Sequence, residues 1–189
     1  MPRIVRAALQ GFQLVGGEGA VHFKSEIEVI GFSFSELVKR EKHVLTKRLR
    51  ERGRGESRES GAFLLGYADA NGAARISDFV LYDDLDPHSL DTGIIRFDGK
   101  YFGRLWAMCR ERGLTVVADV HVHPGDSGQS NSDRAYPMVS QAGHIALILP
   151  RFARKPIQQD DIGIYRYLGG GAWHTVPRVQ RRQFFNIGF

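Results

Sequence analysis

The stretch from Asp119 to Asp133 constrains the fold and the chemistry of this chain more than any other. It continues an apolar run of strand-forming residues, 114–118, and then opens into a loop rich in Gly, Ser and Asn. Alternate residues of a strand point to the same face, so we expect His121 and His123 to project together from the strand end. Asp133 adds a carboxylate from beyond the loop.

Two imidazole nitrogens and one carboxylate oxygen suit a tetrahedral Zn²⁺ ion that keeps one position for water, as catalytic zinc sites do. The sequence therefore predicts that His121, His123 and Asp133 bind zinc. An isolated His-x-His pair is also compatible with two structural histidines, with Asp133 as a helix N-cap. Asp119 and Asp126 are candidates for orienting a ligand histidine, and Asp126 is equally compatible with a turn.

The segment His121-Val-His123-Pro124, followed by Ser130-Asn-Ser-Asp133, resembles the JAMM signature of the JAB/MPN metalloprotease family. The family also places a glutamate just before an apolar strand bounded by glycines, and Glu59-Ser-Gly-Ala-Phe-Leu-Leu-Gly66 has this form. The resemblance covers approximately residues 27–168. The loop before Ser130 is shorter than in the commonest form of the signature, which leaves Ser127 and Ser132 as alternatives to Ser130.

The resemblance implies a zinc-dependent peptidase in which Glu59 is the general base and not a metal ligand. It implies that Ser130 donates a hydrogen bond to the oxyanion. Many members of the family cleave after the C-terminal glycine of ubiquitin or a ubiquitin-like protein. Residues 133–138 and 143–149 are similar to bacterial JAB proteins found with ubiquitin-like conjugation components. The partners so implied are a ubiquitin-like substrate and, in the same pathway, E1-like and E2-like enzymes.

Two other functions remain open beside the active peptidase. One is a catalytically silent MPN scaffold, although every position of the signature is present. The other is a JAMM peptidase acting in another setting, such as DNA repair or phage-related peptide cleavage. Deaminase chemistry is disfavoured, because the chain has one cysteine, Cys109, and lacks the His-x-Glu and Pro-Cys-x-x-Cys ligands.

The composition favours a cytoplasmic domain with a real core. The chain has 189 residues, of which 42% are hydrophobic, and this is enough for one domain with modest extensions. No apolar run approaches the roughly 20 residues that span a membrane, and no signal peptide is visible. Cys109 alone cannot form an intramolecular disulfide or a thiolate zinc cluster, and we expect it to be a small core residue.

The net charge of +5 raises the question of nucleic-acid binding. Much of the excess lies in one block, residues 39–58, where glutamates are interspersed among Lys and Arg. Mixed signs of this kind are typical of a solvated helix face and loop. We therefore expect neither a nucleic-acid nor a membrane partner.

Strand-like and helix-like patterns alternate along the chain and predict an α/β fold with a mixed β-sheet flanked by helices. The family resemblance implies the cytidine-deaminase-like JAB/MPN fold. We divide the chain into an N-terminal strand extension (1–25), the metalloprotease domain (26–176) and a C-terminal tail (177–189) that either packs back on the domain or serves as a docking or dimer segment. Expected strands are 26–32, 62–68, 74–82, 114–122, 144–149, 162–168 and 172–176, and expected helices are 36–52, 99–112 and 133–140.

Two further positions follow from these patterns. We expect His144, at the start of a strand, to be structural and not a third histidine ligand. On the helix of residues 99–112, Leu105, Trp106 and Cys109 are predicted to share the buried face.

Overall fold

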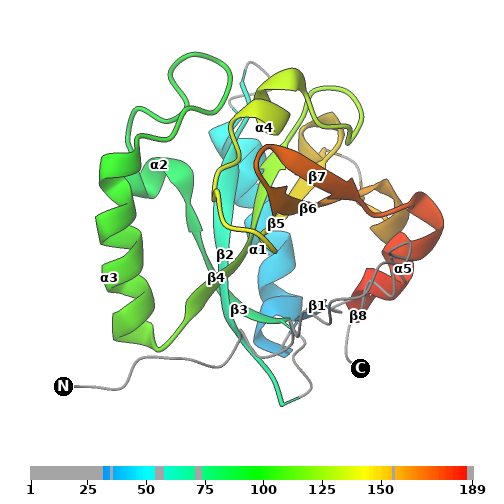
Figure 1. The fold of residues 1–189 in the computed structure, drawn as a ribbon, viewed down its shortest axis with the longest axis horizontal. Helices are drawn as coiled ribbons and strands as arrows, with labels where there is room; N and C mark the ends of the chain where they lie inside the picture. The colour runs from blue at the N-terminus through cyan, green and yellow to red at the C-terminus, as the bar shows by residue number, and fades with distance from the viewer. Residues whose placement is uncertain (1–31, 35, 54–57, 71–73, 155, 187–189) are drawn as a thin grey trace, which may run out of the picture.

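A computed structural model describes residues 32–34, 36–53, 58–70, 74–154 and 156–186 (Figure 1). The predicted N-terminal strand extension, residues 1–25, lies outside these residues, as does most of the strand expected over 26–32. Within them the fold is α/β, with helices flanking a mixed sheet, as predicted; the sheet has eight strands. No helix in the described part of the chain combines the length and the apolar composition needed to cross a membrane.

The strands are β1 (Phe32–Phe34), β2 (Gly61–Ala68), β3 (Ala74–Leu81), β4 (Thr115–Val122), β5 (Ile145–Leu149), β6 (Gly163–Gly169), β7 (Ala172–Thr175) and β8 (Phe185–Asn186). Their order in the sheet is β7-β6-β5-β4-β2-β3-β1-β8. The pairs β4–β5, β1–β3 and β1–β8 are parallel, and the other neighbours are antiparallel. The metal-ligand candidate His121 therefore lies on a central strand.

The helices are α1 (Glu36–Arg52), α2 (Tyr82–Leu85), α3 (Phe102–Arg112), α4 (Asn131–Ala135) and α5 (Arg181–Phe184), with short 3-10 turns at Gly99–Tyr101, Arg151–Ala153, Gln159–Asp161 and Arg178–Gln180. Helix α3 ends at Arg112, as predicted, because Gly113 adopts the left-handed conformation (φ 65°) that favours glycine.

Two helices cover opposite faces of the sheet, α1 on one and α3 on the other (Figure 1). Alternation along β2 explains the layers: Ala62 and Leu64 pack in the cluster that contains Leu49 of α1, whereas Phe63 and Leu65 pack with Leu105 of α3. Each such apolar side chain contributes roughly 1.5–3 kcal/mol when it is fully buried. Both helices are therefore fixed against the strands that carry the candidate site.

Three local expectations need correction. The helix expected over 133–140 is α4, Asn131–Ala135, which begins earlier because Ser130 caps it and ends earlier, with Tyr136 as its C-cap. Trp106 is 40% exposed and stacks on Phe102, so it does not share the buried face of Leu105 and Cys109. Tyr82, expected to end a strand, instead begins α2.

The C-terminal segment packs back on the sheet. Helix α5 places Phe184, which is 1% exposed, in the same core cluster as Leu49. Strand β8 then pairs with β1, with Phe32 opposite Phe185. Of the two possibilities for the tail, the structure shows the first.

Candidate metal centre

Strand β4 brings the candidate residues to one end of the sheet, on the face that α3 partly covers. Within β4, Ala118, Val120 and Val122 pack in the cluster on the α1 face, so Asp119 and His121 point to the other face. His121 pairs with Gly61, the first residue of β2, and this register brings Glu59 next to the end of β4.

The nitrogen and oxygen atoms of His121, His123 and Asp133 converge as a metal ion requires. The two Nε2 atoms lie 3.0 Å apart. Asp133 Oδ1 lies 3.4 Å from His121 Nε2, and Asp133 Oδ2 lies 3.3 Å from His123 Nε2. Ligands about 2.0–2.2 Å from a tetrahedral zinc ion are about 3.3–3.6 Å from one another. The two distances from Asp133 match this spacing, and the two imidazole nitrogens, at 3.0 Å, are slightly closer than a bound ion would hold them. The donor set suits a tetrahedral metal ion that keeps one position for a non-protein ligand.

A capping box holds Asp133 and Ser130 together at the start of α4. The Ser130 hydroxyl oxygen accepts a hydrogen bond from the Asp133 backbone N–H (3.2 Å), and Asp133 Oδ2 accepts one from the Ser130 backbone N–H (2.6 Å). The sequence offered the N-cap as an alternative to a metal ligand for Asp133. In the structure Ser130 is the N-cap, and Asp133, three residues later, keeps Oδ1 free to face His121.

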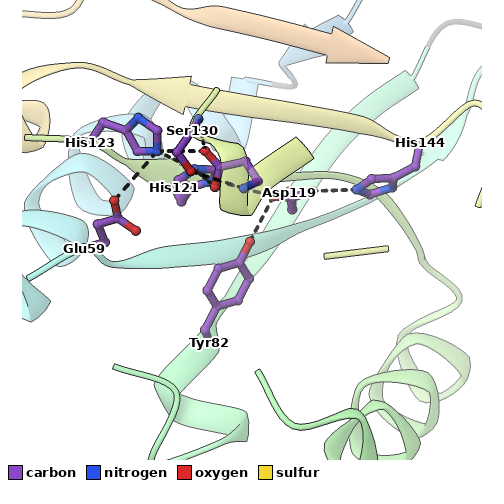
Figure 2. A network of polar contacts seen from close by, with 8 residues as sticks. Glu59, Tyr82, Asp119, His121, His123, Ser130 and His144 are labelled. Atoms are coloured by element: carbon purple, nitrogen blue, oxygen red, sulfur yellow. Dashed lines mark hydrogen bonds and ion pairs between the residues drawn. The ribbon is translucent and has the colours of Figure 1, made fainter. Parts of the chain in front are cut away.

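Glu59 stands beside the cluster without joining it. Its Oε1 lies 3.8 Å from His123 Nε2, and its side chain is 18% exposed (Figure 2). Its backbone N–H donates to Gly93 O at 2.9 Å, which ties the residue to the connection between α2 and α3. This position leaves the carboxylate within reach of a small molecule held next to the cluster.

Asp119 is buried behind His121 and makes polar contacts on both of its oxygens (Figure 2). Its Oδ1 lies 2.6 Å from His144 Nε2, and its Oδ2 accepts a hydrogen bond from the Tyr82 hydroxyl at 3.0 Å. His121 Nδ1 lies 4.0 Å from Oδ2. Burial, the strongest influence, acts to raise the pKa of Asp119, but His121 and His144 outweigh it and hold that pKa at about 2. Asp119 is thus a carboxylate.

The same charges act on His121 and Asp133. Burial acts to lower the pKa of His121, but the carboxylates of Asp119 and Asp133 outweigh it and raise that pKa to about 9. Burial acts to raise the pKa of Asp133, yet hydrogen bonds with both histidines hold it far below its usual range. Without metal, the cluster therefore binds a proton on His121 in neutral solution, and a metal ion has to displace it.

A cavity of about 360 Å³ opens beside the cluster. Apolar and aromatic side chains line much of it, and the sequence patterns single out none of these residues as part of the site: Ile94, Ile95, Tyr136, Pro137, Met138, Ala146 and Trp173. Ser130, Asp133 and Glu59 also line it. The connection between α2 and α3 supplies the first two of the apolar residues.

The remaining sequence candidates fall outside the cluster. His144 is buried against Asp119 and is not among the clustered ligands, in keeping with a structural role. Asp126 accepts a hydrogen bond from the Gly128 backbone N–H (2.8 Å) and forms a turn. Ser127 contributes its backbone carbonyl to the Tyr165 hydroxyl (2.7 Å). Ser132 lines the cavity from within α4.

Comparison with known proteins gives a partial match to a metalloprotease. None of the protein-family models matches the sequence. Over 84 residues the chain is 36% identical to a Sinorhizobium fredii protein named probable metalloprotease y4jG. The match spans 44% of this chain and 52% of that protein, so the chain spans about half the length of this curated relative.

The fold has a counterpart among solved structures. The solution structure of protein DSY2949 from Desulfitobacterium hafniense gives a TM-score of 0.55, covering 83% of this chain and 92% of that one. At 13% identity, this likeness concerns the fold alone.

Proposed function

We propose that the protein is a JAMM-type zinc peptidase of the JAB/MPN family, which cleaves after the C-terminal glycine of a ubiquitin-like protein. The observation that carries the proposal is the convergence of His121, His123 and Asp133 beside Glu59, at a cavity that Ser130 also lines. These are the residues that the signature in the sequence singles out. The partial match to a protein named probable metalloprotease supports the same class of enzyme.

His121, His123 and Asp133 would hold the zinc ion. When bound by three protein ligands, zinc lowers the pKa of water to about 7 and polarises a substrate carbonyl. The capping box contributes to this site by fixing the Asp133 carboxylate, so that its two oxygens face the two histidines. Helix α4 is therefore the element that completes the ligand set.

Glu59 moves the proton. Its carboxylate lies 3.8 Å from His123 Nε2 and is not among the clustered ligand atoms, and from this position it can accept a proton from water held at the cluster. The same group can then deliver this proton to the leaving amine, which departs poorly as an anion. Proton transfer by a positioned carboxylate typically contributes about 10²–10⁴ in rate.

Ser130 stabilises the carbonyl oxygen as it gains negative charge. Its hydroxyl oxygen accepts the Asp133 N–H, and its hydroxyl hydrogen, which can also reach the Asp133 carboxylate, would turn to a substrate in the cavity. Ser127 and Ser132 are less suited, because Ser130 is the one whose hydroxyl is fixed by a residue of the metal cluster. Loss of one such donor typically lowers the rate by about 10²–10³.

The cavity favours an extended, narrow substrate segment. Its apolar walls from Ile95, Met138 and Trp173 suit a peptide backbone with small, uncharged side chains better than they suit charged side chains. Glycine residues at the end of a ubiquitin-like tail can lie flat in such a space, and their backbone groups supply the polar contacts. The proposal places the protein in a conjugation pathway with E1-like and E2-like enzymes, where it processes precursors or removes the modifier.

The test compares wild-type protein with Glu59→Gln, and with Glu51→Gln as a matched control on the exposed surface of α1. The substrates are ubiquitin and bacterial ubiquitin-like proteins that end in glycine, each fused to a C-terminal reporter peptide. We expect zinc-dependent cleavage after the glycine, detected by mass spectrometry. Glu59→Gln should lower the rate by about 10²–10⁴ and keep the zinc, whereas Glu51→Gln should change neither.

Three results would contradict different parts of the proposal. Native cleavage by Glu59→Gln would refute the proton-transfer role. Stoichiometric zinc without cleavage of any glycine-ended fusion would refute the substrate class. Purified wild-type protein that binds no zinc would refute the metal site itself.

A further inference from the structure

Asp119, Tyr82 and His144 form a polar network behind His121. Asp119 is 2% exposed and lies in the sheet between His121 and His144, with Tyr82 approaching from α2 (Figure 2). A buried carboxylate is costly unless hydrogen bonds satisfy both of its oxygens. Here His144 and Tyr82 each bind a different oxygen, at 2.6 and 3.0 Å, and these contacts orient the carboxylate plane.

Close packing holds Tyr82 at this position. A Cβ atom on Gly61 would lie 2.2 Å from Cε2 of the Tyr82 ring, so only glycine lets the ring lie against β2. The ring also packs edge-on against Phe63, with their centroids 4.8 Å apart. The hydroxyl of Tyr82 therefore reaches Asp119 from a rigid support.

Backbone hydrogen bonds hold His144 equally firmly. Its N–H donates to Gln141 O at 3.0 Å, and its carbonyl accepts from the Tyr167 N–H at 2.9 Å. His144 is buried, with 9% of its surface exposed. Asp119 is thus clamped between two anchored donors that come from separate elements of the fold.

The side of Asp119 that remains faces a metal-ligand candidate. His121 Nδ1 lies 4.0 Å from Oδ2, while His121 Nε2 faces His123 and Asp133. A neutral imidazole carries its proton on one nitrogen, and the other nitrogen is then free to bind metal. A carboxylate next to Nδ1 favours the proton there and leaves the Nε2 lone pair for the metal.

We infer that Asp119 is a positioning residue for the metal site, and that Tyr82 and His144 act through it to hold His121 in the tautomer that binds zinc. The inference rests on the zinc site of the proposed function. It assigns roles to three residues outside the JAMM-like signature. Their removal should weaken zinc binding without removing any ligand.

The first experiment measures zinc affinity of Asp119→Asn by competition with a chromophoric chelator. The asparagine amide can keep contact with His144 and Tyr82, but its NH₂ group then faces His121 Nδ1 and favours the tautomer with the proton on Nε2. We expect zinc to bind about 10–100-fold more weakly. Asp86→Asn is the matched control, because Asp86 is also 2% exposed and accepts two hydrogen bonds, from the His88 and Asp98 N–H groups. It should bind zinc within about twofold of wild type.

A second set of variants separates positioning from mere packing. His144→Leu removes the donor to Oδ1 and should weaken zinc binding, whereas His144→Gln places an amide N–H near the same point and should restore most of the affinity. Tyr82→Phe removes only the hydroxyl and should have a smaller effect in the same direction. In zinc-loaded protein labelled with ¹⁵N-histidine, His121 should show a proton on Nδ1 and metal on Nε2, a signature that a purely structural role would not require.

The outcomes are distinct. Zinc affinity of Asp119→Asn within about twofold of wild type would overturn the inference and leave the proposed function intact. If Asp119→Asn does not fold, unchanged zinc affinity in both His144→Leu and Tyr82→Phe would overturn it equally. Wild-type protein without zinc affinity would remove the proposed site and the inference together.

Discussion

The raised pKa of His121 predicts how the stability of the metal-free protein depends on pH. A histidine whose folded pKa exceeds its unfolded value stabilises the fold fully below the unfolded pKa, and this contribution is lost as pH rises through the folded pKa. For His121 these values are about 6.5 and about 9. Stripped of metal, the protein should therefore become less stable between pH 6.5 and pH 9.

The size of the effect follows from the same two values. The folded protein binds one more proton than the unfolded chain in this window, so the free energy of unfolding falls by about 1.36 kcal/mol per pH unit. Over the whole window the loss is about 3 kcal/mol, a large part of the 5–15 kcal/mol that is usual for a domain. Asp119, whose pKa is held at about 2, stays ionised throughout and adds nothing.

Urea unfolding at pH 6.5, 8 and 9, with a chelator present, measures this loss. His121→Gln is the control: it lacks the titrating group, and the difference in pH dependence between the two proteins isolates His121, because Cys109 titrates identically in both. Equal pH dependence of the two proteins would refute the assignment of the proton to His121. With zinc bound, the folded protein no longer holds this extra proton, so the loss of stability between pH 6.5 and 9 should disappear. Because zinc and the proton compete for the same ring, the stabilisation that zinc adds should grow as pH rises towards 9.

Three further predictions concern the serine, the tail and the sheet. Ser130→Ala should lower kcat on the order of 10²-fold with zinc retained, whereas Ser127→Ala, whose backbone carbonyl makes the structural contact, should leave kcat nearly unchanged; a larger loss at Ser127 would move the role there. Phe184→Ala should cost about 3–5 kcal/mol in urea unfolding, because the ring is 1% exposed in the core; a cost below about 1 kcal/mol would show that the tail is not part of the folded core. Gly66→Ala would place a Cβ atom 1.8 Å from Arg75 O, so β2 and β3 must separate locally; unfolding at the wild-type urea midpoint would contradict that packing.

Local patterns were sufficient to predict most of the elements. Strand β2 follows from its apolar run, and α3 from its helical spacing and the terminal Gly113, which needs a positive φ. The predicted start of α4 was wrong because two short-range effects compete there. Asp133 suggested an N-cap, but the hydroxyl of Ser130 satisfies the Asp133 N–H, and this bond places the N-cap at Ser130, three residues earlier.

The face of Trp106 and the fate of the tail depend on tertiary contacts that the sequence does not encode locally. Helical spacing places Trp106 near Leu105, but in the structure its ring stacks on Phe102 at the helix surface, with 40% of its area exposed. Similarly, nothing near Phe184 indicates that β1, about 150 residues earlier in the chain, supplies the pairing partner of β8. Such choices are made by the packing of whole elements.

Part of the candidate site could likewise be predicted from local spacing, and part depends on tertiary contacts. Spacing identified His121, His123 and Asp133, because two candidate ligands fall at a strand end and the third follows the next loop, at the start of α4; the structure brings them together. The Asp119 network could not be assembled from spacing, since its members come from β4, α2 and the residue before β5. The register of β4 against its neighbours brings this network together. Asp119 pairs with Phe63 on one side and with Ala146 on the other, and this places the start of α2 and His144 around a single carboxylate. A one-residue slip of β4 would turn Asp119 and His121 together to the α1 face. The register that builds the core on that face therefore also determines which nitrogen of His121 faces the metal site.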